Sequence, residues 1–257
     1  MMPAQFQGKT ILITGATAGI GLAAAQSLFQ QGASLVITGR DQARLQLATQ
    51  RLQALIESSH KQSVIGVLCD SANVEQIQQM AAQLQRDQIK LDGVLLNAGV
   101  FYPEAFEQTS LENITTTMAV NFTGPAITLQ ALLPCLNKPA SVVFVSSVAV
   151  LKAFATAGVY SASKAAFEGL ARVLNVELAE RGVRINTIRP GVTATEIQAK
   201  AGMDDASIEG FFASLSSTPV GRVLETQDLV PAINYLLTDA SIGLRNAYID
   251  IDGGFCL

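Results

Sequence analysis

Short apolar runs rich in β-branched residues alternate with longer segments of helical period along the whole chain. Parallel strands need a long crossover between them, and a helix usually supplies it, so this alternation is typical of a parallel sheet covered on both faces. We therefore predict an α/β, doubly wound fold with seven mainly parallel strands. The strands are expected at 10–14, 34–38, 63–68, 91–97, 141–146, 183–188 and 247–251, and the helices at about 19–31, 41–58, 73–87, 110–134, 158–180 and 226–238.

The composition fits one globular domain. The chain has 257 residues, of which 49% are hydrophobic and 15% charged, enough to bury an extensive core. No linker, repeat or shift in composition divides it, so residues 1–257 are expected to form a single domain. Segment 195–217 is only weakly helical and interrupts the rhythm, which is typical of a substrate lid.

Charge and rare residues exclude several classes of protein. The net charge is −4 and the 17 Lys and Arg residues are scattered, so neither nucleic acid nor a membrane surface is an expected partner. The first residues do not resemble a signal peptide, so we expect a cytoplasmic protein with reduced thiols at Cys69, Cys135 and Cys256. His60, the one histidine, excludes a Ser-His-Asp hydrolase and a multi-histidine metal site, and we predict no metal.

The first predicted strand runs directly into "TGATAGIG" at 14–21 and then into a helix. Gly15, Gly19 and Gly21 permit a tight turn and a close approach of backbone to ligand, while the helix N-terminus attracts a pyrophosphate. A glycine-rich turn can also be only a turn. The strand before it and the helix after it favour a dinucleotide site.

A second motif places hydroxyl groups and an amine at the end of the fifth predicted strand. Ser146 and Ser147 end that strand, and Tyr160 and Lys164 lie four residues apart on the helix that follows. A tyrosine has a pKa near 10, and a neighbouring ammonium is expected to lower it by up to about three units. Tyr160 is then a candidate acid/base and Lys164 its activator. The alternative is a surface pair on a helix.

Together these motifs resemble the short-chain dehydrogenase/reductases of about 250 residues. The resemblance rests on "TGATAGIG", "NAG" at 97–99, Asn121, Ser147, "YSASK" at 160–164 and "RPGVTAT" at 189–195, and it extends to "IDGGF" near the end. It implies a Rossmann-like fold and a catalytic set of Asn121, Ser147, Tyr160 and Lys164. The spacing of 13 residues between Ser147 and Tyr160 matches the family, which assigns the catalytic serine to Ser147 rather than Ser146.

The resemblance also implies a set of cofactor contacts. Asp70 is expected near the adenine amino group, Lys164 at the nicotinamide ribose, and Val192 and Thr195 at the nicotinamide amide. Asp70 or Ser71 can alternatively cap the next helix. The full set is Gly15, Thr17, Gly19, Ile20, Gly21, Arg40, Asp70, Ser71, Asn97, Ala98, Gly99, Tyr160, Lys164, Pro190, Gly191, Val192 and Thr195.

The residues after the second predicted strand point to NADP(H). NAD-binding dehydrogenases carry an acidic side chain about 20 residues beyond the glycine loop, but Gly39 occupies that place and Arg40 follows it. A guanidinium can hold a 2′-phosphate through paired hydrogen bonds. The alternative is that Arg40 is a solvated residue and Asp41 the N-cap of the next helix. Ala18 stands where the family often adds a second basic residue, so we expect an incomplete preference.

Asn121 stands four residues before Pro125. Proline lacks an N–H group, so in a continuing helix the carbonyl of Asn121 loses its usual partner and the helix kinks. The family uses the corresponding carbonyl to hold a water that relays protons from the lysine. The alternative is a helix that ends near Asn121.

The predicted function is NADP(H)-dependent hydride transfer between the cofactor and a carbonyl or secondary alcohol. A non-catalytic dinucleotide-sensing protein is the alternative, and a nucleotide-sugar epimerase or dehydratase is disfavoured by the glycine spacing. Candidates for an apolar substrate pocket are Phe101, Tyr102, Val148, Leu151, Phe154, Phe211 and Phe212. The helix at 158–180 is apolar over more than one stripe, and with the resemblance this favours a homotetramer or homodimer.

Overall fold

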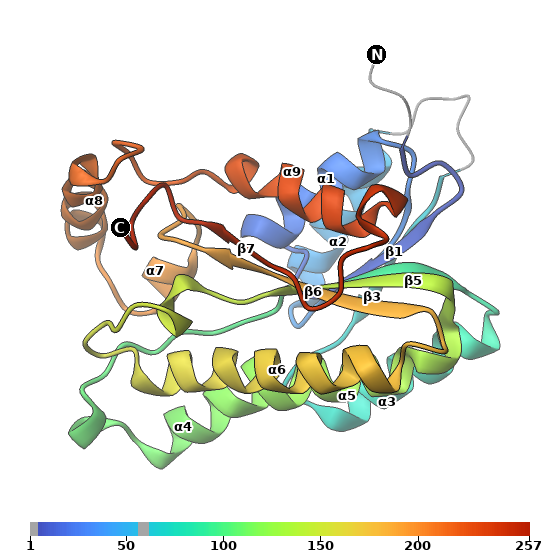
Figure 1. Ribbon diagram of the computed structural model, residues 1–257, viewed down its shortest axis with the longest axis horizontal. Coiled ribbons are helices and arrows are strands. Elements are labelled where there is room, and N and C mark those ends of the chain that lie inside the picture. Colours follow the sequence, from blue (N-terminus) through green and yellow to red (C-terminus); the bar gives the residue numbers. More distant parts are fainter. Residues whose placement is uncertain (1–4, 56–61) are drawn as a thin grey trace.

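The computed structural model describes residues 5–55 and 62–257. Among these residues, seven strands form one parallel sheet, as predicted (Figure 1). Their order is β3-β2-β1-β4-β5-β6-β7. The strands are β1 (Thr10–Ile13), β2 (Ser34–Gly39), β3 (Val64–Leu68), β4 (Leu91–Leu96), β5 (Leu136–Val145), β6 (Val183–Pro190) and β7 (Tyr248–Ile251). His60 and the predicted helix end at 56–58 lie outside the described residues.

Helices cover both faces of the sheet. In Figure 1, α1, α2 and α9 lie above it and α3, α5 and α6 below it. The helices are α1 (Gly19–Gln30), α2 (Gln42–Gln53), α3 (Val74–Arg86), α4 (Leu111–Met118), α5 (Gly124–Leu132), α6 (Gly158–Glu177), α7 (Ile197–Lys200), α8 (Asp205–Ser214) and α9 (Thr226–Leu237). Segment 195–217, expected to be weakly helical, contains α7 and α8.

Two apolar cores follow from the pleat of the strands. Successive side chains of a strand point to opposite faces. Ile11 and Ile13 of β1 therefore pack in the core under α1, α2 and α9, whereas Leu12 between them packs in the core under α3, α5 and α6. Burial on both faces explains why the strands read as continuous apolar runs.

The predicted helix at 110–134 continues past Asn121 rather than ending there. It consists of α4, a π-helical turn at Ala119–Thr123 and α5, with Pro125 in the first turn of α5. A π turn shifts the hydrogen-bond pattern by one residue, which accommodates the missing N–H of proline. Single π turns in a helix are frequent at functional sites.

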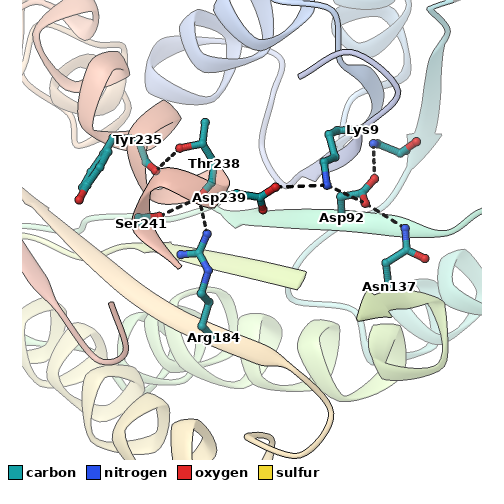
Figure 2. Close-up of polar contacts among 9 residues, drawn as sticks. Lys9, Asp92, Asn137, Arg184, Tyr235, Thr238, Asp239 and Ser241 are labelled. Atoms are coloured by element: carbon teal, nitrogen blue, oxygen red, sulfur yellow. Dashed lines mark hydrogen bonds and ion pairs between the residues drawn. The ribbon is translucent and has the colours of Figure 1, made fainter. Parts of the chain in front are cut away.

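A polar network lies at the amino ends of the central strands (Figure 2). Lys9 Nζ lies 3.7 Å from Asp92 Oδ1 and 3.9 Å from Asp239 Oδ2, and Asn137 donates to Asp92 at 3.0 Å. The buried Arg184 donates to the carbonyl of Thr238 at 2.7 Å. These contacts tie β4, β5 and β6 to the end of α9, at the edge of the sheet opposite the glycine loop.

Candidate functional site

A cavity of about 590 Å³ opens at the carboxyl ends of the strands. The chain runs from β1 outward to β3 and then returns to the other side of β1 with β4, so the order of the strands reverses at β1. Ligands of open α/β sheets bind at such a reversal. Of the predicted site residues, all line the cavity except Gly21 and Asn121.

The glycine loop forms one wall. Gly15 has φ +64°, and a Cβ atom there would lie 3.0 Å from Cα of Ala98, so only glycine fits. Ala18 precedes α1 and offers no capping side chain, and the first turn of α1 contains no acidic residue. The first N–H groups of α1 are therefore suited to an anionic ligand, and the loop fits a pyrophosphate.

Gly21 acts in packing rather than at the cavity surface. A Cβ there would lie 2.5 Å from both Asn97 Nδ2 and the carbonyl oxygen of Gly15. Asn97 in turn donates from Nδ2 to the carbonyls of Thr14 and Gly15, at 3.0 and 3.1 Å. The predicted "NAG" segment thus fixes the shape of the glycine loop as well as lining the cavity.

At the end of β2 the structure agrees with the alternative, because Asp41 caps α2 by accepting from the backbone N–H of Arg44 at 2.9 Å, and Arg40 is exposed. Arg40 also lines the cavity, so its contact with a cofactor stays a prediction. The capping alternative for Asp70 and Ser71 is wrong. Asn73 caps α3 instead, and both Asp70 and Ser71 line the cavity.

Lys164 and Tyr160 occupy the centre of the site on α6. Lys164 is 3% exposed, and its Nζ donates to the carbonyl of Val145 at 2.8 Å. Burial lowers the pKa of Lys164 to about 8, against a smaller raising effect of Glu168. At neutral pH Lys164 therefore carries its charge, and it loses the charge more easily than an exposed lysine.

The expected depression of the Tyr160 pKa is wrong. Burial raises the pKa of the phenol, because it penalises the phenolate, and the hydrogen bond with Ser147 lowers it by a smaller amount. The Nζ of Lys164 lies 5.8 Å from the centroid of the Tyr160 ring. Tyr160 is thus held in its protonated form at neutral pH.

Ser146 and Ser147 have separate surroundings. Ser147 accepts from the backbone N–H of Ala149 at 3.2 Å, and its hydroxyl is close enough to Tyr160 to lower the pKa of the phenol. Ser146 donates to Glu168 at 2.7 Å, and Glu168 also pairs with Arg189 of β6, at 2.7 Å. Ser146 is therefore committed to a buried network that joins β5, α6 and β6, and Ser147 is the serine next to Tyr160.

Asn121 lies behind the cavity rather than in its lining. It is fully buried, accepts from the N–H of Val100 at 2.9 Å and donates to the carbonyl of Val100 at 2.9 Å and to Ser163 Oγ at 3.1 Å. A Cβ at Gly99 would lie 3.4 Å from Asn121 Oδ1 and 3.3 Å from Lys164 Nζ. The Asn121 side chain thus holds the loop after β4 beside Lys164.

The remainder of the lining is largely apolar. Of the seven apolar candidates, Phe101, Val148, Phe154 and Phe211 line the cavity, whereas Tyr102, Leu151 and Phe212 do not. Phe101 packs against Tyr160 with the ring centroids 5.0 Å apart.

The lining residues that sequence reasoning missed include Gln198, Met203 and Phe255. The ring of Phe255 stacks on Phe154 with the centroids 5.5 Å apart, and the backbone carbonyl of Phe255 accepts from Lys152 at 2.6 Å. No local signal marks these positions, because the segments that carry them enter the cavity only through the tertiary fold.

The start of the predicted lid is attached to α2. Arg44 donates to both carboxylate oxygens of Glu196, at 2.6 and 2.5 Å, and Lys200 lies 2.9 Å from the same group. These hydrogen bonds, that of Arg44 above all, lower the pKa of Glu196 to about 2. Glu196 and Lys200 line the cavity on the side of α2 and Arg40.

None of the helices in residues 5–55 and 62–257 is long and apolar enough to cross a membrane. These residues also contain no group of three or more His, Cys, Asp or Glu side chains arranged to hold a metal ion.

Comparison with known proteins agrees with this geometry. The model of a family described as enoyl-(acyl carrier protein) reductase matches residues 15–256. The chain is 29% identical to a glucose 1-dehydrogenase of Gluconobacter oxydans over 98% of its own length and 94% of that protein.

Solved structures are similar over nearly the whole chain. A short-chain type dehydrogenase/reductase from Mycobacterium marinum superposes with a TM-score of 0.87 at 25% identity, covering 98% of this chain and 97% of that one. A short-chain dehydrogenase from Burkholderia cenocepacia in complex with NADP gives 0.86 at 25% identity, covering 97% and 98%. The chain belongs to the short-chain dehydrogenase/reductase family of oxidoreductases.

Proposed function

We propose that this protein is an NADP(H)-dependent oxidoreductase that interconverts a carbonyl compound and a secondary alcohol. The observation that carries the proposal is that Ser147, Tyr160 and the buried Lys164 line the same cavity as the glycine loop at the start of α1. The NADP complex of the similar Burkholderia structure supports the choice of cofactor.

The protein's own groups have complementary roles in the reduction. When bound beside Tyr160 and Lys164, the nicotinamide would supply the hydride for the carbonyl carbon. Tyr160 donates its proton to the carbonyl oxygen, and its raised pKa keeps that proton available at neutral pH. Ser147 donates a hydrogen bond to the same oxygen as negative charge develops there. Lys164 carries a positive charge close by and stabilises the phenolate that remains.

The apolar lining indicates which carbonyl compounds fit. Phe101 contacts Tyr160, and Phe154 and Phe255 form a stacked pair in the same cavity. The charged lining residues Arg40, Glu196 and Lys200 lie instead on the side of α2. We therefore favour an uncharged ketone that carries an aromatic or other bulky apolar group.

The test is NADPH consumption with a panel of carbonyl compounds, measured for the unmodified protein and for Tyr160→Phe. The variant retains the ring but lacks the proton donor, so kcat/KM is expected to fall by about 10²- to 10⁴-fold. Its Kd for NADPH, measured by calorimetry, is expected to stay within about twofold. Tyr102→Phe is the matched control, because Tyr102 does not line the cavity.

Two outcomes contradict the proposal. Substantial turnover by Tyr160→Phe would remove Tyr160 from the chemistry. Tight binding of NADPH by the unmodified protein, with no turnover of any carbonyl in the panel, would favour a dinucleotide-sensing protein.

A further inference from the structure

Glu168 lies one turn beyond Lys164 on the face of α6 that carries Tyr160. The three residues are spaced by four in the sequence, so they follow one side of the helix. Tyr160 and Lys164 line the cavity, whereas Glu168 does not and is 7% exposed. A buried carboxylate is costly unless it is paired and hydrogen-bonded, so the burial of Glu168 depends on the contacts that it makes.

The carboxylate of Glu168 is held in one orientation. Arg189 donates from Nε to Oε1 at 2.9 Å and from Nη2 to Oε2 at 2.7 Å. Such a pair of hydrogen bonds fixes the plane of the carboxylate as well as its position. Cζ of Arg189 in turn lies 4.0 Å from the centroid of the Tyr248 ring, and its Nη1 lies 3.5 Å from Asp250 Oδ1. Both members of the ion pair are therefore fixed by their surroundings.

The oriented carboxylate holds the end of β5. The hydroxyl of Ser146 donates to Glu168 Oε1 at 2.7 Å, and the carbonyl of Val145, the residue before it, accepts from Lys164 at 2.8 Å. Two consecutive residues of the strand are thus bound to two residues of α6 that are one turn apart. Ser147 comes next, and because consecutive Cα atoms are only about 3.8 Å apart, its position follows that of Ser146.

The attachment matters because α6 also carries Tyr160. The distance between Ser147 and Tyr160 depends on how the end of β5 is placed on α6, and the contact of Ser146 with Glu168 is one of the two that place it. A misplacement of about 1 Å in an active site can lower a rate by about 10²-fold.

The same strand contains a serine that serves as a comparison. Ser141 is 2% exposed, as Ser146 is, and its hydroxyl donates to the carbonyl of Leu236 at 2.7 Å. Ser141 does not line the cavity and lies further from Ser147 along β5. The two serines therefore match in burial and in the length of the hydrogen bond, but only Ser146 is next to Ser147.

We propose that Glu168 is a positioning residue, which acts through Ser146 to hold Ser147 at the distance from Tyr160 that the reaction requires. The inference rests on the proposed function, and it adds a residue that lies outside the cavity. Ser147 donates to an oxygen whose negative charge grows in the transition state, so its misplacement lowers kcat more than it raises KM.

The test measures kcat and KM for a carbonyl substrate with saturating NADPH in Ser146→Ala. This variant removes the contact with Glu168 but keeps the ion pair of Glu168 and Arg189, so no buried charge is left unpaired. We expect kcat to fall about tenfold while KM stays within about twofold. Ser141→Ala is the matched control. It should lose a similar free energy of unfolding in a denaturant titration, with kcat unchanged.

A second variant tests the carboxylate itself. In Glu168→Gln the amide nitrogen would face a donor of Arg189, so the side chain must turn, and kcat should fall in the same direction. The assays are run at pH 6, well below the pKa of about 8 of Lys164, so that this lysine stays charged without the carboxylate. In a Ser147→Ala background the group to be positioned is gone, so adding either variant should change kcat by less than about twofold.

An unchanged kcat in Ser146→Ala or in Glu168→Gln, beside a loss of turnover in Tyr160→Phe, would overturn the inference and leave the proposed function intact. A loss that persists in the Ser147→Ala background, or an equal loss in Ser141→Ala, would also overturn it, because the network would then act on the fold rather than on Ser147. If the unmodified protein reduces no carbonyl compound, the proposed function fails and the inference fails with it.

Discussion

Lys164 is buried beside Tyr160 with the carbonyl of Val145 as its hydrogen-bond acceptor, so burial rather than an ion pair sets its pKa. The same burial acts in the opposite direction on Tyr160, because the charged form of the phenol is the deprotonated one. At the residue scale the site therefore holds a lysine that loses its proton at a lower pH than an exposed lysine, and a tyrosine that keeps its proton to a higher pH than an exposed tyrosine. Both effects have consequences that solution experiments can measure.

The first prediction concerns stability against pH. The pKa of Lys164 is about 8 in the folded protein and near 10.5 in the unfolded chain, so the unfolded chain binds more protons between these values. The free energy of unfolding therefore gains about 3 kcal/mol from Lys164 as the pH rises through this window. In Lys164→Met this gain is lost.

Denaturant titrations between pH 7 and 10.5 measure the gain as the difference between the two proteins. The difference must be taken because Tyr160 and Cys69 have raised pKa values and therefore change the stability in the opposite direction in both proteins. A difference that does not change with pH would show that Lys164 has an ordinary pKa.

The second prediction concerns Arg40 and the cofactor. The unmodified protein is expected to use NADPH at least about tenfold more efficiently than NADH, and Arg40→Ala should reduce that ratio to near one, because the guanidinium no longer holds the 2′-phosphate. Steady-state kcat/KM with both cofactors measures this, with Arg51→Ala as an exposed control outside the cavity lining. Substituting Gly39 as well is less informative, since a Cβ there would lie 2.4 Å from Thr17 Cγ2. Equal use of both cofactors by the unmodified protein would contradict the role of Arg40.

At the scale of elements, the predicted lid is not a weakly ordered insertion but two helices with an ion-paired start. Glu196 precedes α7 and joins it to Arg44 of α2, while Gln198, one residue into α7, reaches Thr193. The lid is thus attached on two sides of the cavity, near the adenine side and near the reacting end. The pairing depends on the negative charge of Glu196. Because its pKa is about 2, the carboxylate stays charged until the pH falls to about 2.

The third prediction is that Glu196→Gln loosens α7 without unfolding the protein. The amides of Lys200 and Ala201, which donate to the carbonyls of Glu196 and Ile197, should exchange with solvent several-fold faster. The thermal midpoint should change little, because the pair is half-exposed. Lys200→Met, which keeps the Arg44 contact, should have a smaller effect. Unchanged exchange at these amides would show that the ion pair does not hold α7.

At the scale of the whole molecule, α6 has an apolar face that its own sheet does not cover. Phe167 and Ala171 are buried in the core, whereas Val173 and Val176 are 51% and 78% exposed. Ala162, Ala165 and Gly169 extend the same exposed face with small side chains. Small residues allow close approach, so this face suits a second copy of the same helix, consistent with the expected homo-oligomer.

The fourth prediction uses Gly169. A Cβ at Gly169 meets no atom of the described chain within 4 Å, so Gly169→Leu leaves the fold of one chain unchanged. If two α6 helices pack together there, the added side chain separates them, and sedimentation should show a smaller species than for the unmodified protein. Gly169→Ala is the matched control and should keep the assembly. A monomeric unmodified protein at micromolar concentration would rule out the homo-oligomer.

The sequence by itself determined the seven parallel strands, the glycine turn and the placement of Ser147, Tyr160 and Lys164. Most of these features depend on local rules: the period of apolar residues, the glycines that permit a tight turn, and a four-residue spacing on one helix. The choice of Ser147 over Ser146 depended instead on the resemblance to the family.

The tertiary structure alone decided the direction of the Tyr160 pKa, the contact of Ser146 with Glu168 and the stacking of Phe255 on Phe154. Each of these depends on burial or on a partner that folding brings from elsewhere in the chain. The four-residue spacing of Tyr160 and Lys164 predicted a lowered pKa for the phenol. In the folded protein the pKa is raised, because desolvation of the phenolate outweighs the hydrogen bond with Ser147.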